Sequence, residues 1–170
     1  MAIKCHQIAC RSQSRCMQGA EFDAPGQKAI HARYVEESVM PDHGHLESIC
    51  AAAAIRGVEV VIGVVERAVD RGGHTLYCSA LWIDAQGHLV NNHRKMVPTH
   101  EERLCWGNGD GAGLRTRRVG ELRVGVLNCW ENWMPLARTA LQSDGMDVHI
   151  LLWPGAKSLT RDLTRMVARE

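Results

Sequence analysis

The stretch ELRVGVLNCWENWMPLAR, residues 121–138, decides the fold of this chain. It opens with an apolar run from Leu122 to Leu127, rich in valine and leucine, which is typical of a strand buried in a sheet. After a short break comes Pro135, and proline suits the first turn of a helix because its missing N–H has no partner there. The apolar pattern then becomes helical until Gly145, which predicts a strand followed by a helix.

A second apolar run, Asp147–Trp153, follows that helix and predicts another strand. Strand, turn, helix and strand form a βαβ unit, and the two strands of such a unit are parallel. Parallel sheets are usually covered on both faces. The predicted class is therefore α/β.

Cys129 lies at the end of the first of these strands, shortly before the helix. Ligands of open α/β sheets bind at the carboxyl ends of the strands. The positive end of a helix dipole favours the thiolate form of a cysteine, which is the nucleophile. A small buried apolar residue is the alternative interpretation. Position alone leaves both interpretations open.

Composition limits the kinds of partner. The 170 residues suit one domain, and 45% of them are hydrophobic. The net charge of +1, from 20 basic and 19 acidic residues, suggests neither a polyanion nor a membrane surface as a partner. No basic stripe indicates nucleic-acid binding. The seven irregularly spaced cysteines argue against a secreted disulfide framework, so we expect a cytoplasmic protein.

The rest of the chain also shows the mixture of helices and strands expected of an α/β protein. Apolar periodicity, glycines and turn residues predict, in order, a helix at His45–Arg56, a strand at Val58–Val65, a hairpin of Thr75–Asp84 with His88–Lys95, a structured loop at Met96–Arg118 and a helix at Ser158–Glu170. Long loops in compact domains are usually functional, so the loop at Met96–Arg118 is a candidate part of a site.

Residues 1–32 lack a strand or helix period, which predicts a disordered N-terminal segment preceding a domain at residues 33–170. Cys5, His6, Cys10 and Cys16 lie in this segment. They contain no C-x-x-C pair, which argues against a zinc site.

Three side chains with complementary chemistry come together if the sheet is parallel: Lys95, Glu102 and Cys129. Attack by a cysteine on a carbon–nitrogen multiple bond leaves negative charge on the nitrogen. An ammonium group stabilises that charge, and carboxylates move protons. The simpler interpretations are that Lys95 belongs to a solvated basic run and that Glu102 belongs to a surface charge pair.

Ordered motifs favour the catalytic interpretation. They are HRKMVPT at His93–Thr99, ERLCWG at Glu102–Gly107, CWEN at Cys129–Asn132 and PLAR at Pro135–Arg138. With these motifs the chain resembles the nitrilase branch of the carbon–nitrogen hydrolase superfamily, from about Arg33 to its last residue.

The resemblance implies a partial four-layer αββα sandwich and a hydrolase that converts a nitrile to a carboxylic acid and ammonia. Cys129 would be the nucleophile that forms a thioimidate and then an acyl-enzyme, and Lys95 would stabilise the tetrahedral intermediates. Glu102 would orient Lys95 and the attacking water, and Trp130 and Glu131 would shape the substrate-binding pocket. The resemblance implies no metal or organic cofactor, and it implies a homo-oligomer.

The sequence departs from the family pattern in ways that predict an incomplete domain with impaired activity. The family's first glutamate, the general base, follows a strand that ends in Pro-Glu, and no such segment is present. The two opening strands of the family fold are not recognisable in residues 1–32, and the elements expected after Glu170 are absent. Two alternatives stay open: an amidase that uses the same cysteine chemistry, or an inactive fragment that only associates with full-length subunits.

Overall fold

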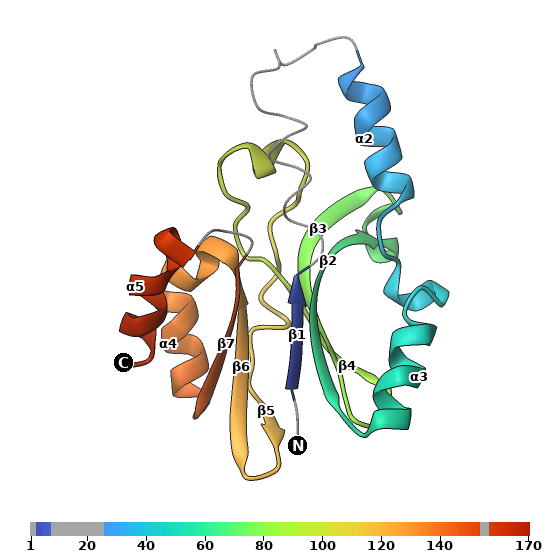
Figure 1. Cartoon of the computed structure of the whole chain (residues 1–170). Helices are drawn as coiled ribbons and strands as arrows, with labels where there is room; N and C mark the ends of the chain where they lie inside the picture. The colour runs from blue at the N-terminus through green and yellow to red at the C-terminus, as the bar shows by residue number, and fades with distance from the viewer. Residues whose placement is uncertain (1–2, 8–25, 154–156) are drawn as a thin grey trace.

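The computed structural model describes residues 3–7, 26–153 and 157–170 (Figure 1). The strands are β1 (Ile3–Gln7), β2 (Glu59–Ala68), β3 (Thr75–Ile83), β4 (Leu89–Arg94), β5 (Arg117–Val119), β6 (Leu122–Asn128) and β7 (Val148–Leu152). The α-helices are α2 (Gln27–Glu36), α3 (Glu47–Arg56), α4 (Pro135–Ser143) and α5 (Lys157–Val167). Short 3-10 helices are η1 (Pro41–His43), η2 (Val69–Arg71), η3 (His100–Leu104) and η4 (Cys129–Trp133).

The strands form two sheets that pack face to face. In the first sheet the order is β1-β2-β3-β4, where β1 is parallel to β2 and the other neighbours are antiparallel. In the second the order is β5-β6-β7, where β5 is antiparallel to β6 and β7 is parallel to it. The core between the sheets consists of Val61, Ala80, Trp82, Val119, Val124, Val126, Ile150 and Leu152.

Helices cover the outer face of each sheet, which confirms the predicted four-layer αββα arrangement (Figure 1). Leu46, at the start of α3, packs with Ile62 and Leu81 of the first sheet. Leu141 of α4 packs against Leu127 of β6 on the other side of the molecule. α3 and α4 thus each bury apolar side chains against their sheet, as surface helices of a globular protein do.

The βαβ unit predicted from residues 121–153 is confirmed. β6 and β7 pair in parallel from Val124↔Val148 to Asn128↔Leu152, with α4 as the crossover. Gly125 leaves room for the side chains of this crossover, because a Cβ there would lie 2.7 Å from the Met146 sulfur and 3.0 Å from a Leu141 methyl group. The predicted helix that begins near His45, the strand beginning near Val58 and the hairpin are also confirmed. The last helix ends at Val167 rather than at Glu170.

The start of the chain differs from the prediction. Ile3–Gln7 forms β1, which pairs with β2 from Ile3↔Glu59 to Gln7↔Gly63, and α2 begins at Gln27. The expectation that no opening strand lies in residues 1–32 is therefore wrong for Ile3–Gln7. Strand pairing uses backbone groups, so β1 needs no side-chain period. The rest of that segment, with Cys10 and Cys16, lies outside the described residues.

Candidate active site

Lys95 and Cys129 each follow directly after the last residue of a strand. Lys95 follows β4 in the first sheet, and its N–H donates to the Cys78 carbonyl oxygen at 2.8 Å. Cys129 follows β6 in the second sheet. Both side chains are buried. The face-to-face packing of the sheets therefore brings the two predicted catalytic residues to one region.

The third predicted residue, Glu102, contacts Lys95 directly. The Lys95 ammonium Nζ donates to Glu102 Oε2 at 2.6 Å and to Thr99 Oγ1 at 3.0 Å. Glu102 Oε2 also accepts the Thr99 backbone N–H at 2.7 Å, which forms a capping box at the start of η3. The loop between β4 and β5 thus holds the carboxylate against the ammonium through its own local sequence.

The charge on Lys95 is maintained by its neighbours. Burial opposes the ammonium form, but the negative charge of the Cys129 thiolate and the hydrogen bond to Glu102 outweigh it, and the pKa of Lys95 is raised. The interaction is mutual, so the ammonium favours the thiolate form of Cys129. A buried ammonium next to a thiolate can stabilise the negative charge that develops when the thiolate attacks a substrate.

Cys129 has an unusual backbone conformation. Its φ is 53°, in the left-handed region that residues with a Cβ rarely adopt. The surrounding turn holds it there: the Asn132 side-chain amide donates to the Cys129 carbonyl oxygen at 2.8 Å, and Asn128 and Glu131 form a capping box. Such strained residues occur often at functional sites.

The helix-dipole part of the Cys129 prediction needs correction. The short helix η4 begins at Cys129 itself, and α4 begins only at Pro135. The influence of a helix terminus falls off within the first turn, so α4 does not act on the thiol as predicted. The positive charge that acts on Cys129 comes from Lys95.

The two residues predicted to shape the pocket lie in different environments. The Trp130 ring is 44% exposed and stacks on the Trp133 ring with centroids 5.7 Å apart. Glu131 is fully buried, and His93 lies against its carboxylate at 2.8 Å. Substrate contact by Trp130 or Glu131 stays a prediction. His93 was missed as a site residue, although it lies two positions before Lys95, so that the alternation of side chains in β4 puts both on one face.

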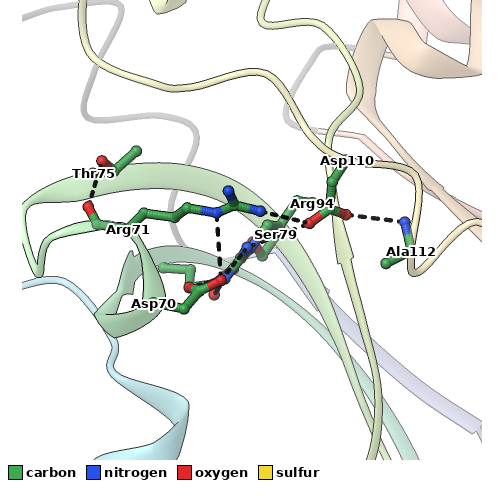
Figure 2. A network of polar contacts seen from close by, with 8 residues as sticks. Asp70, Arg71, Thr75, Ser79, Arg94, Asp110 and Ala112 are labelled. Atoms are coloured by element: carbon green, nitrogen blue, oxygen red, sulfur yellow. Dashed lines mark hydrogen bonds and ion pairs between the residues drawn. The ribbon is translucent and has the colours of Figure 1, made fainter.

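Arg94, between His93 and Lys95, belongs to a separate charged network (Figure 2). Its guanidinium donates to Glu66 Oε1 at 2.7 Å and to Asp70 Oδ1 at 2.9 Å, and it lies 3.5 Å from Asp110. The hydrogen bond to Glu66, and then the one to Asp70, raises the pKa of Arg94. Arg94 therefore connects the end of β4 to β2 and to the Gly107–Gly113 loop and takes no part in the Lys95 cluster.

The described part of the chain contains neither a metal-binding cluster nor a membrane-spanning helix. No group of three or more His, Cys, Asp or Glu residues within it could hold a metal ion. None of its helices is both long and apolar enough to cross a membrane.

Comparison with known proteins identifies the class. The family model described as carbon-nitrogen hydrolase matches residues 4–169. This chain therefore belongs to the carbon–nitrogen hydrolase family, and its resemblance to the nitrilase branch is confirmed by its relatives. It is 39% identical over 145 residues to Nitrilase 2 of an unknown prokaryotic organism, covering 83% of this chain and 46% of that protein. It is 38% identical over 135 residues to the aliphatic nitrilase of Rhodococcus rhodochrous, covering 78% of this chain and 36% of that protein.

Solved structures confirm the fold. An amidase from Nesterenkonia sp. AN1, shown with acrylamide added to its active-site cysteine, matches with a TM-score of 0.65 at 15% identity. That match covers 81% of this chain and 55% of the amidase chain. A carbon-nitrogen hydrolase from Helicobacter pylori G27 matches with a TM-score of 0.56 at 18% identity, covering 80% of this chain and 51% of that one. The chain spans less than half the length of the two nitrilases and about half the length of these structures.

Proposed function

We propose that this chain carries the nucleophile, the lysine and the second glutamate of a nitrilase that hydrolyses a nitrile to a carboxylic acid and ammonia. One observation carries the proposal. The buried Lys95 ammonium is held 2.6 Å from Glu102 and interacts electrostatically with Cys129, directly after β6.

The arrangement supports a covalent route. The Cys129 thiolate attacks the nitrile carbon, an S–C bond forms, and one electron pair of the triple bond moves to nitrogen, which takes up a proton to give a thioimidate. Lys95 stabilises the negative charge as it develops. Water adds to the carbon and ammonia leaves, which gives a thioester. A second water then breaks the C–S bond, and the carboxylic acid and the thiolate are released.

Glu102 orients the Lys95 ammonium in this scheme and, by the family resemblance, the attacking water. The family's first glutamate has no counterpart in the sequence motifs, so the two hydrolytic steps lack a recognised general base. Loss of a general base typically lowers a rate by about 10²–10⁴-fold. We therefore expect formation of the S–C bond to be faster than turnover in this chain.

A nitrile is the preferred substrate class for two reasons. Trp130, Glu131 and Asn132 follow the nucleophile as they do in nitrilases, whereas amidases and carbamoylases differ there. The matched relatives at 38–39% identity are themselves named nitrilases. Hydrolysis of an amide by the same thiolate is the second candidate, because it needs the same nucleophile and the same charge stabilisation.

Two broader expectations accompany the proposal. The irregular spacing of the seven cysteines favours a reducing compartment such as the cytoplasm. Exposed apolar side chains near the nucleophile, Trp130, Trp133 and Leu136, favour association with another subunit.

The test compares a nitrile with the amide of the same carbon skeleton. We expect intact-protein mass spectrometry to detect a nitrile adduct on the wild type and none on Cys129→Ala, with slow ammonia release from the nitrile. Faster release from the amide would favour the amidase instead. Ammonia release that survives Cys129→Ala would contradict the proposal as a whole.

A further inference from the structure

Lys95 and Cys129 follow strands of different sheets, so their separation depends on how the two sheets pack on one another. The core between the sheets is apolar and its contacts have no preferred direction. Apolar contacts alone do not position catalytic groups precisely enough, because a displacement of about 1 Å can cost 10²-fold in rate. A polar connection between the sheets near both residues would provide it.

The Glu131 carboxylate makes such a connection. Its Oε2 lies 2.8 Å from His93 Nε2 and accepts the Asn128 backbone N–H at 3.1 Å, and its Oε1 accepts the Met96 backbone N–H at 2.8 Å. His93 and Met96 lie on either side of Lys95 in sequence, whereas Asn128 immediately precedes Cys129. One carboxylate thus joins the segment that carries the lysine to the segment that carries the nucleophile.

Burial makes this connection rigid and fixes the proton of His93. The side chains of His93 and Glu131 are both fully buried. An ionised carboxylate only accepts hydrogen bonds, so His93 Nε2 carries a proton and donates it. His93 Nδ1 is buried and has no hydrogen-bond partner among the described residues, so a proton there would be an unpaired buried donor. The hydrogen bond to Glu131 therefore requires a hydrogen on Nε2.

We propose that His93 and Glu131 are positioning residues that hold Lys95 at a fixed distance from Cys129, an inference that rests on the proposed function. Neither residue needs to touch the substrate. Glu131 supports the segments that carry Lys95 and Cys129, through the backbone N–H groups of Met96 and Asn128 and the imidazole of His93. This role accounts for a fully buried acid two residues after the nucleophile, where a substrate contact was predicted.

The test measures the reactivity of Cys129 rather than turnover. The rate of alkylation of Cys129 by iodoacetamide is followed by peptide mass spectrometry across the neutral to alkaline range. His93→Leu removes the donor, whereas His93→Gln keeps an amide N–H near the position of Nε2. We expect His93→Leu to slow labelling by about 10-fold and to raise the pH of half-maximal labelling by about one unit, because the ammonium no longer stabilises the thiolate.

Two further variants distinguish a positioning role of His93 and Glu131 from a general contribution to stability. His93→Gln should recover most of the wild-type rate, and Glu131→Gln, which turns an amide N–H toward a backbone donor, should slow labelling as His93→Leu does. His149→Leu is the matched control, because His149 is a half-buried histidine of β7 whose buried ring nitrogens have no hydrogen-bond partner in the described chain. Its labelling should equal that of the wild type.

Cys50, a partly buried free cysteine of α3 far from this cluster in sequence, serves as the internal reference for unfolding in every sample. Wild-type reactivity and pH profile in a folded His93→Leu would overturn the positioning role, as would a His93→Gln variant as slow as His93→Leu. If Cys129 of the wild type reacts no faster than Cys50, the proposed function itself fails, and the positioning role fails with it.

Discussion

The guanidinium of Arg138 and the carboxylate of Glu170 form a two-point ion pair that joins helix α4 to the residues after α5. Arg138 Nε donates to Glu170 Oε2 at 2.6 Å and Nη2 donates to Oε1 at 2.7 Å. The remaining nitrogen, Nη1, donates to the Asn132 carbonyl oxygen at 2.8 Å, inside the turn that begins at Cys129. Arginine suits this site because its planar fork can bind a carboxylate and a carbonyl at once.

Glu170→Gln should therefore lower the melting temperature and loosen the turn at Cys129. The effect should depend on pH with a defined sign. The hydrogen bond from Arg138 holds the pKa of Glu170 below its ordinary value of 4.5. The carboxylate therefore stabilises the fold at neutral pH, and this contribution is lost as the pH falls through the lowered pKa.

Thermal unfolding of wild type and Glu170→Gln at several pH values checks this prediction. The difference in melting temperature should be constant at neutral pH and should vanish in acid. Glu121→Gln, at an exposed glutamate before β6, is the control and should change the melting temperature little. A Glu170→Gln difference that persists unchanged into strong acid would contradict the ion-pair explanation.

Gly109 allows the loop after η3 to pack closely on Lys95. Its N–H donates to the Lys95 carbonyl oxygen at 2.9 Å. A Cβ at this position would lie 2.8 Å from the same oxygen and would also collide with the Arg94 carbonyl oxygen. Both obstacles are backbone atoms, so the strand or the loop must move. Gly109→Ala should cost about 1–3 kcal/mol of stability and should slow Cys129 labelling.

Gly72→Ala is the control for Gly109→Ala, because it introduces backbone strain without a steric clash. Gly72 has a φ of +74° and nothing within 4 Å of its would-be Cβ, so alanine there costs about 1 kcal/mol from the left-handed conformation alone. Urea unfolding measures the loss of unfolding free energy in each of the two variants. We expect only Gly109→Ala to change the labelling rate of Cys129, and equal labelling in the two variants would contradict a link between this loop and Lys95.

His149 makes the fold sensitive to mild acid. Burial, and then the positive charge of Arg138, lowers the pKa of His149 to about 4, despite the negative charges of Glu170 and Glu131. The unfolded chain therefore binds a proton at a higher pH than the folded chain does, and stability falls as the pH drops from about 6.5 toward 4. The loss attributable to His149 amounts to about 3 kcal/mol over this range.

His149→Leu should remove that loss. Urea titrations of wild type and variant at neutral and mildly acidic pH measure how much unfolding free energy each protein loses in acid. At neutral pH the variant should be at least as stable as the wild type, because it removes ring nitrogens that have no hydrogen-bond partner among the described residues. His74→Leu, at an exposed histidine, should leave the pH dependence unchanged. The same pH dependence in wild type and His149→Leu would contradict the prediction.

The sequence predicted what depends on local pattern. The run from Leu122, the proline at 135 and the glycine at 145 define β6, α4 and the turn before β7, because each feature acts within a few residues. The cluster of Lys95, Glu102 and Cys129 was predicted from the motifs that resemble the nitrilase branch rather than from local pattern alone. Lys95 and Glu102 are seven residues apart, and a Thr99 capping box joins them. Motif and fold together then bring Cys129 to the same region.

What the sequence did not predict depends on long-range contacts. His93 and Glu131 are 38 positions apart in the sequence, so no local pattern predicts the hydrogen bond between them. The strand β1 consists of polar and apolar residues without a period, and its pairing with β2 is set by backbone groups. The short helix η4 depends on the capping box of Asn128 and Glu131, which separates Cys129 from the helix predicted to act on it.

The pair of Lys95 and Glu102 should show a large energetic coupling. Lys95 is fully buried, and Glu102 is the carboxylate whose hydrogen bond supports its charge. Glu102→Gln leaves a buried ammonium with weaker compensation, and loss of one partner of a buried pair typically costs about 3–5 kcal/mol. Because the pKa of Lys95 is raised above 10.5, this contribution is present below that pH and disappears only as the pH rises further.

A double-mutant cycle measures the coupling. Lys95→Met removes the charge, so Glu102→Gln should cost much less in that background than in the wild type, with a coupling of about 1–3 kcal/mol. The exposed pair of Arg123 and Asp144, 3.3 Å apart, is the matched control and should couple by less than about 1 kcal/mol. A Lys95–Glu102 coupling no larger than that of the control pair would mean that Thr99 and Cys129, rather than Glu102, compensate the buried ammonium. Glu102 would then not be the group that holds Lys95 as proposed.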